Sequence, residues 1–304
     1  MAQTSANIPK NSGEAILAAD ETTDDAVSVL GSISSSSASV SSSILDYRTE
    51  NGRTYHRYKD GKYSYPNDET ESDRLEMQHN LFLVTYDNKL GTAPPNDTSL
   101  GVEVKRVLDV GTGTGVWAVE FGDEHPEAEV LGVDLSAIQP DFLRLTISKN
   151  PGHSPSPCRT GESIYRDATT AWPPSTLCTD TSPFSALEKS GRAFQSIPAL
   201  RGMMLDIGFR DVTMTKYKWP TNPWAKDAKH KKIGAWNNEN LNAGVEAWAM
   251  APFTRVHGWT RVEVQGFLVD VRKDLGDRRI HAYWPIYSLW GRKPTVEEAR
   301  GIGN

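Results

Sequence analysis

Apolar positions recur at helical spacing in the segment that follows the turn signal Pro66-Asn67-Asp68. They predict a helix over residues 69–88 that packs one face against a larger part of the protein. The side chains on its stripe, at three- and four-residue spacing, are Leu75, Gln78, His79, Phe82 and Tyr86. A Pro-rich loop over residues 91–97 ends this helix.

A second pattern changes from strand to helix and back to strand within residues 104–134. It consists of an apolar strand over 104–110, the loop Gly111-Thr112-Gly113-Thr114-Gly115, a helix over 116–121 and a strand over 128–133 that ends in Asp134. A strand, a glycine loop, a helix and a second strand in this order predict a parallel β-α-β unit. The predicted fold class is therefore α/β with a Rossmann-like sheet.

The carboxyl-terminal half predicts further elements after an irregular stretch. Residues 141–183 contain scattered prolines without helical or strand periodicity, so we expect irregular chain there. The patterns that follow predict a helix over 184–206, a strand over 210–219, helices over 227–250 and 261–274, and a strand over 281–290. A polar tail over 295–304 follows.

The amino-terminal residues 1–43 combine acidic side chains with a serine block over 32–43 and almost no large apolar groups. Such a segment cannot bury enough apolar surface to offset the entropy of ordering, so we expect it to be disordered. No site is assigned to it. One domain over residues 44–294 remains.

Composition narrows the possible partners and the cellular compartment. The formal net charge is −6, from 33 Lys and Arg against 39 Asp and Glu, which disfavours direct binding to nucleic acid or to an anionic membrane. No apolar run resembles a secretory signal or a membrane span. The two cysteines, Cys158 and Cys178, have no metal-ligand spacing, so we expect an intracellular protein without a metal.

The glycine loop and Asp134 suggest a nucleotide-like cofactor. Glycines at the start of a helix let a ligand approach the backbone, where free N–H groups favour a carboxylate or a phosphate. Asp134 lies 23 positions after Gly111, close to the spacing of a ribose-binding acid. A tight turn followed by an ordinary strand-end acid is the plain alternative.

Two cofactors compete for such a site. A dinucleotide fingerprint has the spacing G-x-G-x-x-G, whereas this loop has G-x-G-x-G, and Val116 stands where the third glycine would be. This difference favours S-adenosylmethionine, which carries an aminocarboxylate instead of a pyrophosphate. A nicotinamide-dependent oxidoreductase stays the weaker alternative.

Ten short segments resemble the fungal LaeA-like class I methyltransferases. They are residues 51–56 (NGRTYH), 63–69 (YSYPNDE), 74–79, 108–117 (LDVGTGTGVW), 132–140 (GVDLSAIQP), 208–212, 223–227, 254–259, 271–273 and 281–283. The resemblance covers about residues 45–140 and 183–294. It implies a methyltransferase that depends on S-adenosylmethionine and belongs to a group associated with the regulation of fungal secondary metabolism.

The resemblance also implies a cofactor site. The residues that match the cofactor loop are Asp109, Gly111, Thr112, Gly113 and Gly115. Asp134 matches the ribose acid, Ser136 the adenosine side, and Tyr55 and Tyr58 an amino-terminal cover over the cofactor. The methyl acceptor, a small molecule or a protein, is left open. Regulatory protein partners and a location in the nucleus or cytoplasm are implied as well.

The middle of the chain departs from this family. A class I sheet needs roughly a hundred residues after the ribose acid for its third, fourth and fifth strands. Only residues 141–183 stand there, so we expect an incomplete central sheet. A catalytically inactive protein with a regulatory or binding role is therefore the alternative function.

No catalytic base is assigned. His79, His257 and His281 are candidates, and each can equally be a packing or surface histidine. The basic run over residues 229–232 is either a nuclear-import signal or a solvated helix face.

Overall fold

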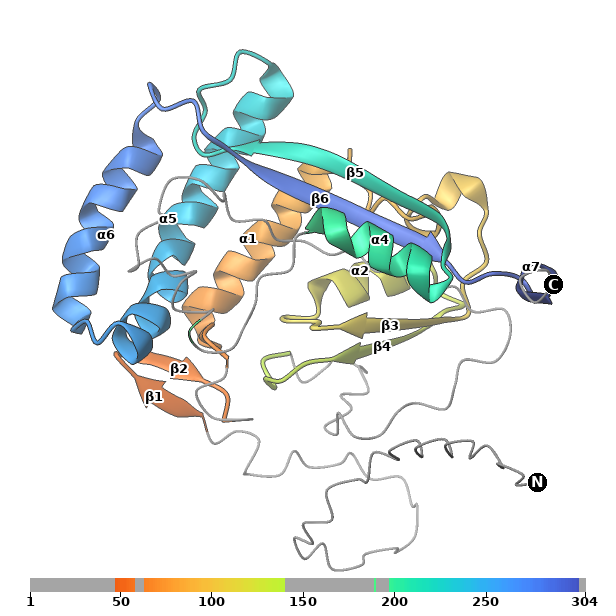
Figure 1. Ribbon diagram of the computed structural model, residues 1–304, viewed down its shortest axis with the longest axis horizontal. Helices are drawn as coiled ribbons and strands as arrows, with labels where there is room; N and C mark the ends of the chain where they lie inside the picture. Colours follow the sequence, from red (N-terminus) through yellow and green to blue (C-terminus); the bar gives the residue numbers. More distant parts are fainter. Residues whose placement is uncertain (1–46, 58–62, 140–188, 190–196, 301–304) are drawn as a thin grey trace, which may run out of the picture. The chain divides into compact units, whose positions relative to one another are not determined.

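The computed structural model describes residues 47–57, 63–139, 189 and 197–300. Among them, β3 (Arg106–Val110), α2 (Val116–Glu124) and β4 (Glu129–Val133) form the β-α-β unit that the sequence predicts (Figure 1). The two strands are parallel, with Asp109 opposite Gly132. The carboxyl ends of both strands therefore lie at the same edge.

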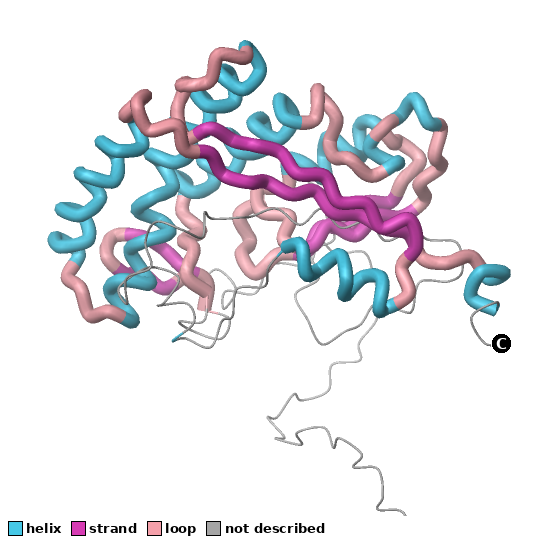
Figure 2. The backbone as a smooth tube through the Cα atoms, turned by 45° about the horizontal axis from the view of Figure 1, so that its top comes forward, coloured by secondary structure: helices cyan, strands magenta, loops and turns pink. Residues whose placement is uncertain are grey.

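The carboxyl-terminal half contributes two long antiparallel strands. β5 (Arg210–Pro220) pairs with β6 (Tyr283–Arg292), and Figure 2 shows the two strands side by side. Between them in the sequence come α5 (Ala228–Val256) and α6 (Arg261–Gly276), and α5 packs against β5. All four predicted elements are confirmed. α4 (Ile197–Ile207) precedes β5, and the short α7 (Val296–Arg300) lies in the predicted polar tail.

The core joins α1 (Glu69–Thr85) to α5 and to the β5–β6 ribbon. One cluster consists of the buried side chains Leu81, Trp219, Ile233 and Ile286, with Phe82 packed against it. A second cluster lies between α5 and α6 and includes Val245, Met250, Phe253, Val264 and Leu268. Burial of these apolar side chains stabilises the helical half of the protein.

A buried ion pair within α1 orients Arg74 toward α5. The side chains of Arg74 and Glu71 are each 5% exposed, and Arg74 Nη2 lies 2.7 Å from Glu71 Oε1. Arg74 Nη1 donates to Asn240 Oδ1 at 2.9 Å, and the guanidinium lies 5.4 Å from the ring centre of Trp248. Because both charges have partners, their burial is tolerated, and α1 packs on α5 through Arg74 as well as through apolar residues.

A small hairpin precedes α1. β1 (Arg48–Glu50) and β2 (Arg53–Tyr55) are antiparallel, and Asn51 and Gly52 join them with φ of 52° and 81°. Two positive φ values are required by a type I′ turn, and Asn-Gly is the usual pair for it. The sequence analysis did not predict this hairpin.

The described residues form three separate two-stranded sheets, β1–β2, β3–β4 and β5–β6. Within this part of the chain, β3 pairs with β4, and the predicted incomplete central sheet stays a prediction. The irregular stretch 141–183, the amino-terminal tail 1–43 and residues 184–188 and 190–196 of the predicted helix lie outside the described residues. The predicted α/β class is confirmed.

Candidate functional site

The loop after β3 needs its glycines. Gly111, Gly113 and Gly115 have φ of 79°, 58° and 85°, a backbone conformation that side chains with a Cβ rarely adopt. Leu75 of α1 lies beside this loop, with Cδ1 3.5 Å from where a Cβ on Gly113 would stand. The loop is therefore shaped by backbone conformation and lies against α1.

The loop presents the start of α2 without a cap. The backbone N–H groups of Gly111 and Thr112 donate to the carbonyl of Val133 at 2.7 and 3.1 Å, which ties the loop to the end of β4. Gly115 precedes the helix, and no side chain caps it there. Uncapped N–H groups at a helix start attract a carboxylate or a phosphate.

Asp134 lies directly after β4 and faces the glycine loop. Its Oδ2 accepts the Gly113 N–H at 2.8 Å, and its Oδ1 accepts the Ser136 N–H at 2.9 Å. Each carboxylate oxygen has about two acceptor positions, so each keeps one for a ligand hydroxyl. The two N–H groups thus fix the carboxylate in an orientation that suits a ribose diol.

Gln139 was not singled out by the sequence analysis and belongs to the same site. Its Nε2 donates to the carbonyls of Gly113 and Ser136 at 2.5 and 3.2 Å. Its Oε1 is buried and has no hydrogen-bond partner. The sequence carried a signal for Gln139, because this residue lies in the segment 132–140 that resembles the LaeA-like methyltransferases.

Asp109 lies in the same region, at the penultimate position of β3. Burial raises the pKa of its carboxyl above the ordinary value, and the charge of Asp134 acts in the same direction. A cation placed beside Asp109 would lower the pKa of its carboxyl again.

On β4, Gly132 leaves room for Thr112, whose Oγ1 lies 3.0 Å from where a Cβ on Gly132 would stand.

The amino-terminal segment touches this site through residues that the sequence analysis did not assign to the site. Tyr47 donates its hydroxyl to the carbonyl of Ala137 at 3.1 Å, and Asn67 Nδ2 donates to Ser136 Oγ at 3.2 Å. Burial raises the pKa of Tyr47. The segment before α1 therefore packs on the loop that follows Asp134.

Tyr55, predicted as part of the cover, is buried in β2. The guanidinium of Arg255 lies 4.7 Å from its ring centre, and burial raises the pKa of its hydroxyl. Its role over the cofactor stays a prediction. Tyr58, the other predicted cover residue, lies outside the described residues.

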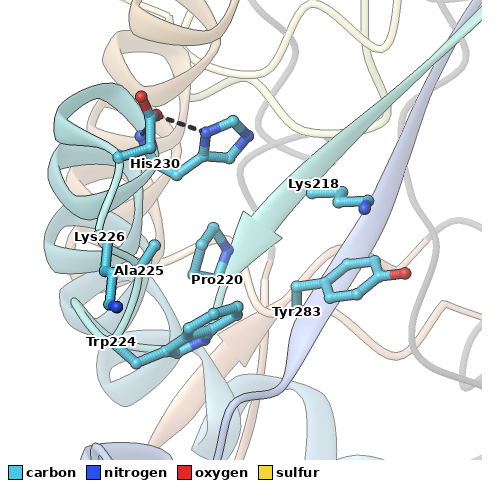
Figure 3. A pocket seen from close by; sticks show the side chains of 8 residues that line it. Lys218, Pro220, Trp224, Ala225, Lys226, His230 and Tyr283 are labelled. Atoms are coloured by element: carbon cyan, nitrogen blue, oxygen red, sulfur yellow. Dashed lines mark hydrogen bonds and ion pairs between the residues drawn. The ribbon is translucent and has the colours of Figure 1, made fainter.

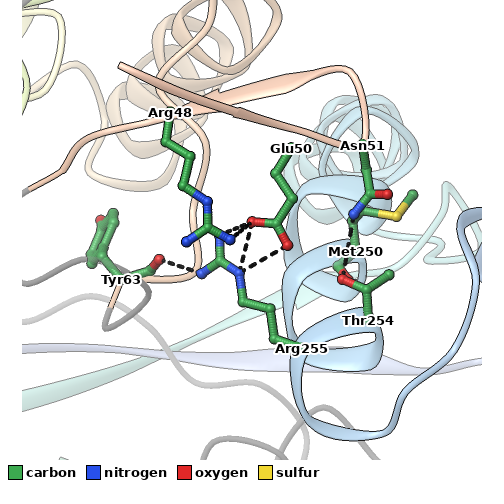
Figure 4. A network of polar contacts seen from close by, with 7 residues as sticks. All are labelled: Arg48, Glu50, Asn51, Tyr63, Met250, Thr254 and Arg255. Atoms are coloured by element: carbon green, nitrogen blue, oxygen red, sulfur yellow. Dashed lines mark hydrogen bonds and ion pairs between the residues drawn. The ribbon is translucent and has the colours of Figure 1, made fainter. Parts of the chain in front are cut away.

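The β1–β2 hairpin is fastened to the end of α5 by a polar network (Figure 4). Arg255 Nη2 lies 2.8 Å from Glu50 Oε2, and Arg48 pairs with the same carboxylate at 2.5 Å. Asn51 Nδ2 donates to Thr254 Oγ1 at 3.4 Å. This network holds the predicted cover segment on the helical half.

The three candidate bases lie in three different environments. His79 Nε2 is 2.8 Å from Glu120 Oε2 and joins α1 to α2. His257 ends α5 beside the ring of Phe253, and His281 stacks on Trp224 with ring centres 4.9 Å apart. Each of these contacts suits a packing role.

The basic run at residues 229–232 forms part of the first turns of α5. Lys229 pairs with Asp87 at 2.7 Å, while Lys231 and Lys232 are exposed.

Within the described residues, no group of three or more His, Cys, Asp or Glu side chains could hold a metal ion. No helix in that part of the chain has the length and apolar character needed to cross a membrane.

A parallel β-α-β unit, an open glycine loop and a fixed strand-end carboxylate define a protein that fits an adenosine-containing cofactor. No protein-family model matches the chain. The chain is 34% identical over 292 residues to the secondary metabolism regulator LAE1 of Cochliobolus heterostrophus, and the match covers 81% of this chain and 94% of that protein. It is 31% identical over 308 residues to methyltransferase pytC of Aspergillus terreus, covering 86% and 92%.

A third relative, the protein-methionine methyltransferase laeA of Emericella nidulans, is 28% identical over 293 residues and is covered to 77%. The chain belongs to the LaeA/pytC-like family of fungal S-adenosylmethionine-dependent methyltransferases. The family implies S-adenosylmethionine as the cofactor and a methyl acceptor as the second substrate. A methyltransferase structure from Geobacter sulfurreducens with S-adenosylhomocysteine aligns with 71% of this chain at 13% identity and a TM-score of 0.34.

Proposed function

We propose that this chain binds S-adenosylmethionine between the glycine loop and Asp134 and transfers its methyl group to an acceptor. One observation carries the proposal most directly. The carboxylate of Asp134 is held by the N–H groups of Gly113 and Ser136, and each oxygen keeps an acceptor position toward the site.

Three groups of the cofactor have matching residues. Its carboxylate fits the open start of α2 beside Gly111, Gly113 and Gly115, where helix N–H groups and the helix dipole favour negative charge. The ammonium group of the cofactor fits the partly buried carboxyl of Asp109, whose pKa is raised by burial. The ribose hydroxyls fit Asp134.

The remaining predicted residues complete the site. Thr112 lies in the loop itself, and Ser136, whose Oγ accepts a hydrogen bond from Asn67, is proposed for the adenosine side. Tyr55 and Tyr58 are proposed as the cover. Gln139 supports both loops, and its buried Oε1 is an acceptor within the same site.

When bound, S-adenosylmethionine supplies an electrophilic methyl group on a positively charged sulfur. A lone pair of the acceptor forms a bond to the methyl carbon while the carbon–sulfur bond breaks and its electron pair remains on sulfur. The chain's residues act by holding the two reactants in line, which is the main requirement of such a displacement. An acceptor that is already nucleophilic needs no base, which accords with the packing contacts of the three histidines.

The acceptor is proposed only as a class, a small molecule or a protein. One relative is described as a protein-methionine methyltransferase and another as a regulator of secondary metabolism. The second description supports a role of this chain in the regulation of fungal secondary metabolism. Protein partners and a location in the nucleus or cytoplasm are part of the proposal.

A second function is favoured by the short middle of the sequence. The resemblance to the family implies further central strands after Asp134 that place the acceptor, and only residues 141–183 stand there. A protein that binds the cofactor without turnover and acts as a regulatory module would have this structure.

A methyl-transfer assay separates the two functions. Purified full-length protein is incubated with S-adenosylmethionine labelled in its methyl group and with a fungal extract, and label is followed in proteins and in small molecules. The Asp134→Ala variant is the control. Label transfer that depends on Asp134 supports the enzyme, whereas a wild-type protein that binds the cofactor and transfers no label supports the regulatory module.

A further inference from the structure

The two faces of the β5–β6 ribbon differ sharply. One face carries Trp219 and Ile286, which are buried in the core with Leu81. Lys216 and Lys218 alternate with Trp219 and lie on the opposite face, where both are exposed. The part of this second face around Lys216 and Lys218 is therefore basic and accessible to solvent.

Aromatic rings accompany these lysines. Lys216 Nζ lies 5.7 Å from the ring centre of Tyr287, and Lys218 Nζ lies 5.1 Å from that of Tyr283. The strand register accounts for the pairs, because Lys216 is opposite Tyr287 and Pro220 is opposite Tyr283. The rings extend the lysine side chains along the surface and keep their ammonium groups outward.

A small pocket lies at the end of this face, before α5 begins (Figure 3). Its apolar lining comes from Pro220, Trp224, Ala225 and Tyr283, and its volume is about 190 Å³. Trp224 is fixed, because its Nε1 donates to the Ala282 carbonyl at 2.8 Å and its ring stacks on His281. The pocket is thus preformed.

The charges that line the pocket are positive in sum. Lys218 and Lys226 line it, and neither forms an ion pair in the described part of the chain. The one carboxylate, Asp227, is already used, since it caps α5 by accepting the His230 N–H at 2.9 Å and pairs with His230 Nδ1 at 2.6 Å. These bonds lower the pKa of Asp227, so the carboxylate stays ionised and bound to its own helix.

We propose that this surface binds a short acidic segment of a partner protein, with one apolar side chain of that segment in the pocket. The volume is below the roughly 300–1,000 Å³ of small-molecule sites, so it suits a single anchoring side chain. The lysines attract carboxylates and steer the encounter. The net charge of −6 disfavours a long polyanion such as nucleic acid, which would meet repulsion beyond this surface.

The probe is a set of fluorescein-labelled peptides rich in glutamate, each with a central Leu, Phe or Trp, and the same peptide with a central Ser. Binding to the full chain is followed by fluorescence anisotropy at physiological salt. The charge-reversed variant Lys218→Glu/Lys226→Glu should weaken binding by about tenfold or more. The matched variant Lys231→Glu/Lys232→Glu makes the same charge change at exposed positions of α5 outside the pocket and should bind almost as the wild type does.

The expected result is saturable binding of at least one apolar-centred peptide that exceeds the Ser-centred one and depends on Lys218 and Lys226. Thermal melts of both variants check folding, which exposed lysines should not affect. The proposal is overturned if no peptide saturates, if both charge-reversed variants lose the same affinity, or if the Ser-centred peptide binds equally well. Tighter binding of a single-stranded oligonucleotide that depends on the same lysines would overturn it in favour of a nucleic-acid surface.

Discussion

The carboxylate of Asp134 accepts the backbone N–H of Gly113 at 2.8 Å, and this bond joins the loop after β4 to the loop after β3. Gln139 holds the carbonyl of the same glycine at 2.5 Å. Both polar groups of Gly113 are therefore bound by residues of the neighbouring loop. The shape of the glycine loop therefore depends on Asp134 and Gln139.

Replacing Gln139 tests this dependence. Gln139→Leu leaves the carbonyls of Gly113 and Ser136 without their donor, so the free energy of unfolding should fall by about 1–2 kcal/mol. Affinity for S-adenosylhomocysteine should fall about tenfold, as measured by thermal shift and calorimetry. Gln139→Glu should be worse, because a carboxylate would face the carbonyl oxygens. Unchanged affinity in both variants would contradict the support role.

Alanine substitutions at a crowded and at an uncrowded glycine of the β-α-β unit test whether steric contact shapes the loop. An added Cβ at Gly132 would meet Thr112 Oγ1 at 3.0 Å, so Gly132→Ala should displace the loop and weaken cofactor binding by about tenfold. At Gly122 in α2, the nearest atom is 3.9 Å away. Gly122→Ala should therefore leave binding unchanged and raise stability by about 0.5–1 kcal/mol. Equal cofactor affinity in the two variants would refute this account of the loop.

Asp109 gives a pH dependence with a definite sign. Burial raises the pKa of Asp109 above the ordinary 3.8, so the folded protein holds this proton more tightly than the unfolded chain does. Stability from this group is fully present below 3.8 and is lost as pH rises through the folded-state pKa. Asp109→Asn should therefore gain stability relative to the wild type as pH rises from acid to neutral.

Urea titrations of both proteins at several pH values measure this difference, and the remaining carboxylates cancel because they are common to both. Because Asp109 is proposed to hold the ammonium group of the cofactor, Asp109→Asn should also bind S-adenosylmethionine more weakly. A variant that is more stable and binds equally well would leave the carboxyl without this role.

The packing of α5 on the turn after β5 makes a further prediction. A Cβ on Gly234 would lie 2.3 Å from the carbonyl oxygen of Asn222, a backbone atom that cannot move aside easily. Gly234→Ala should lower the free energy of unfolding by about 1–3 kcal/mol. Gly266 of α6 has no atom within 4 Å, so Gly266→Ala should raise stability by about 0.5–1 kcal/mol. Denaturant unfolding measures both, and a neutral Gly234→Ala would show that the turn is not packed in this way.

Periodicity predicted the elements that bury a regular apolar face. β3 and β4 followed from short apolar runs around the glycine loop, and α6 from a helical pattern that a Thr260–Glu263 capping box begins. The helix that became α5 was predicted to end at Met250. It continues to Val256 through Pro252, because Phe253 is buried in the core and the packing outweighs the proline.

Polar contacts between distant segments were not predictable in the same way. Arg74 is buried on α1 because Glu71 and Asn240 bond to it, and an apolar pattern gives no signal for such a pair. The β1–β2 hairpin had a local signal in Asn51-Gly52, but its strands are short and depend on Arg255 of α5 for support. The contact between Gln139 and Gly113 spans two loops and required the structure.

Cofactor binding at Asp134 is the central claim, and calorimetric titration tests it most directly. Folded full-length wild type, Asp134→Ala and the control Asp123→Ala, an exposed position on α2, are titrated with S-adenosylmethionine and S-adenosylhomocysteine. We predict saturable binding to the wild type and the control, and a loss of about a hundredfold in Asp134→Ala, because hydrogen bonds to a charged group contribute about 1.5–3 kcal/mol each. A folded wild type that binds neither ligand, or an Asp134→Ala variant that binds as tightly, would contradict the proposed site.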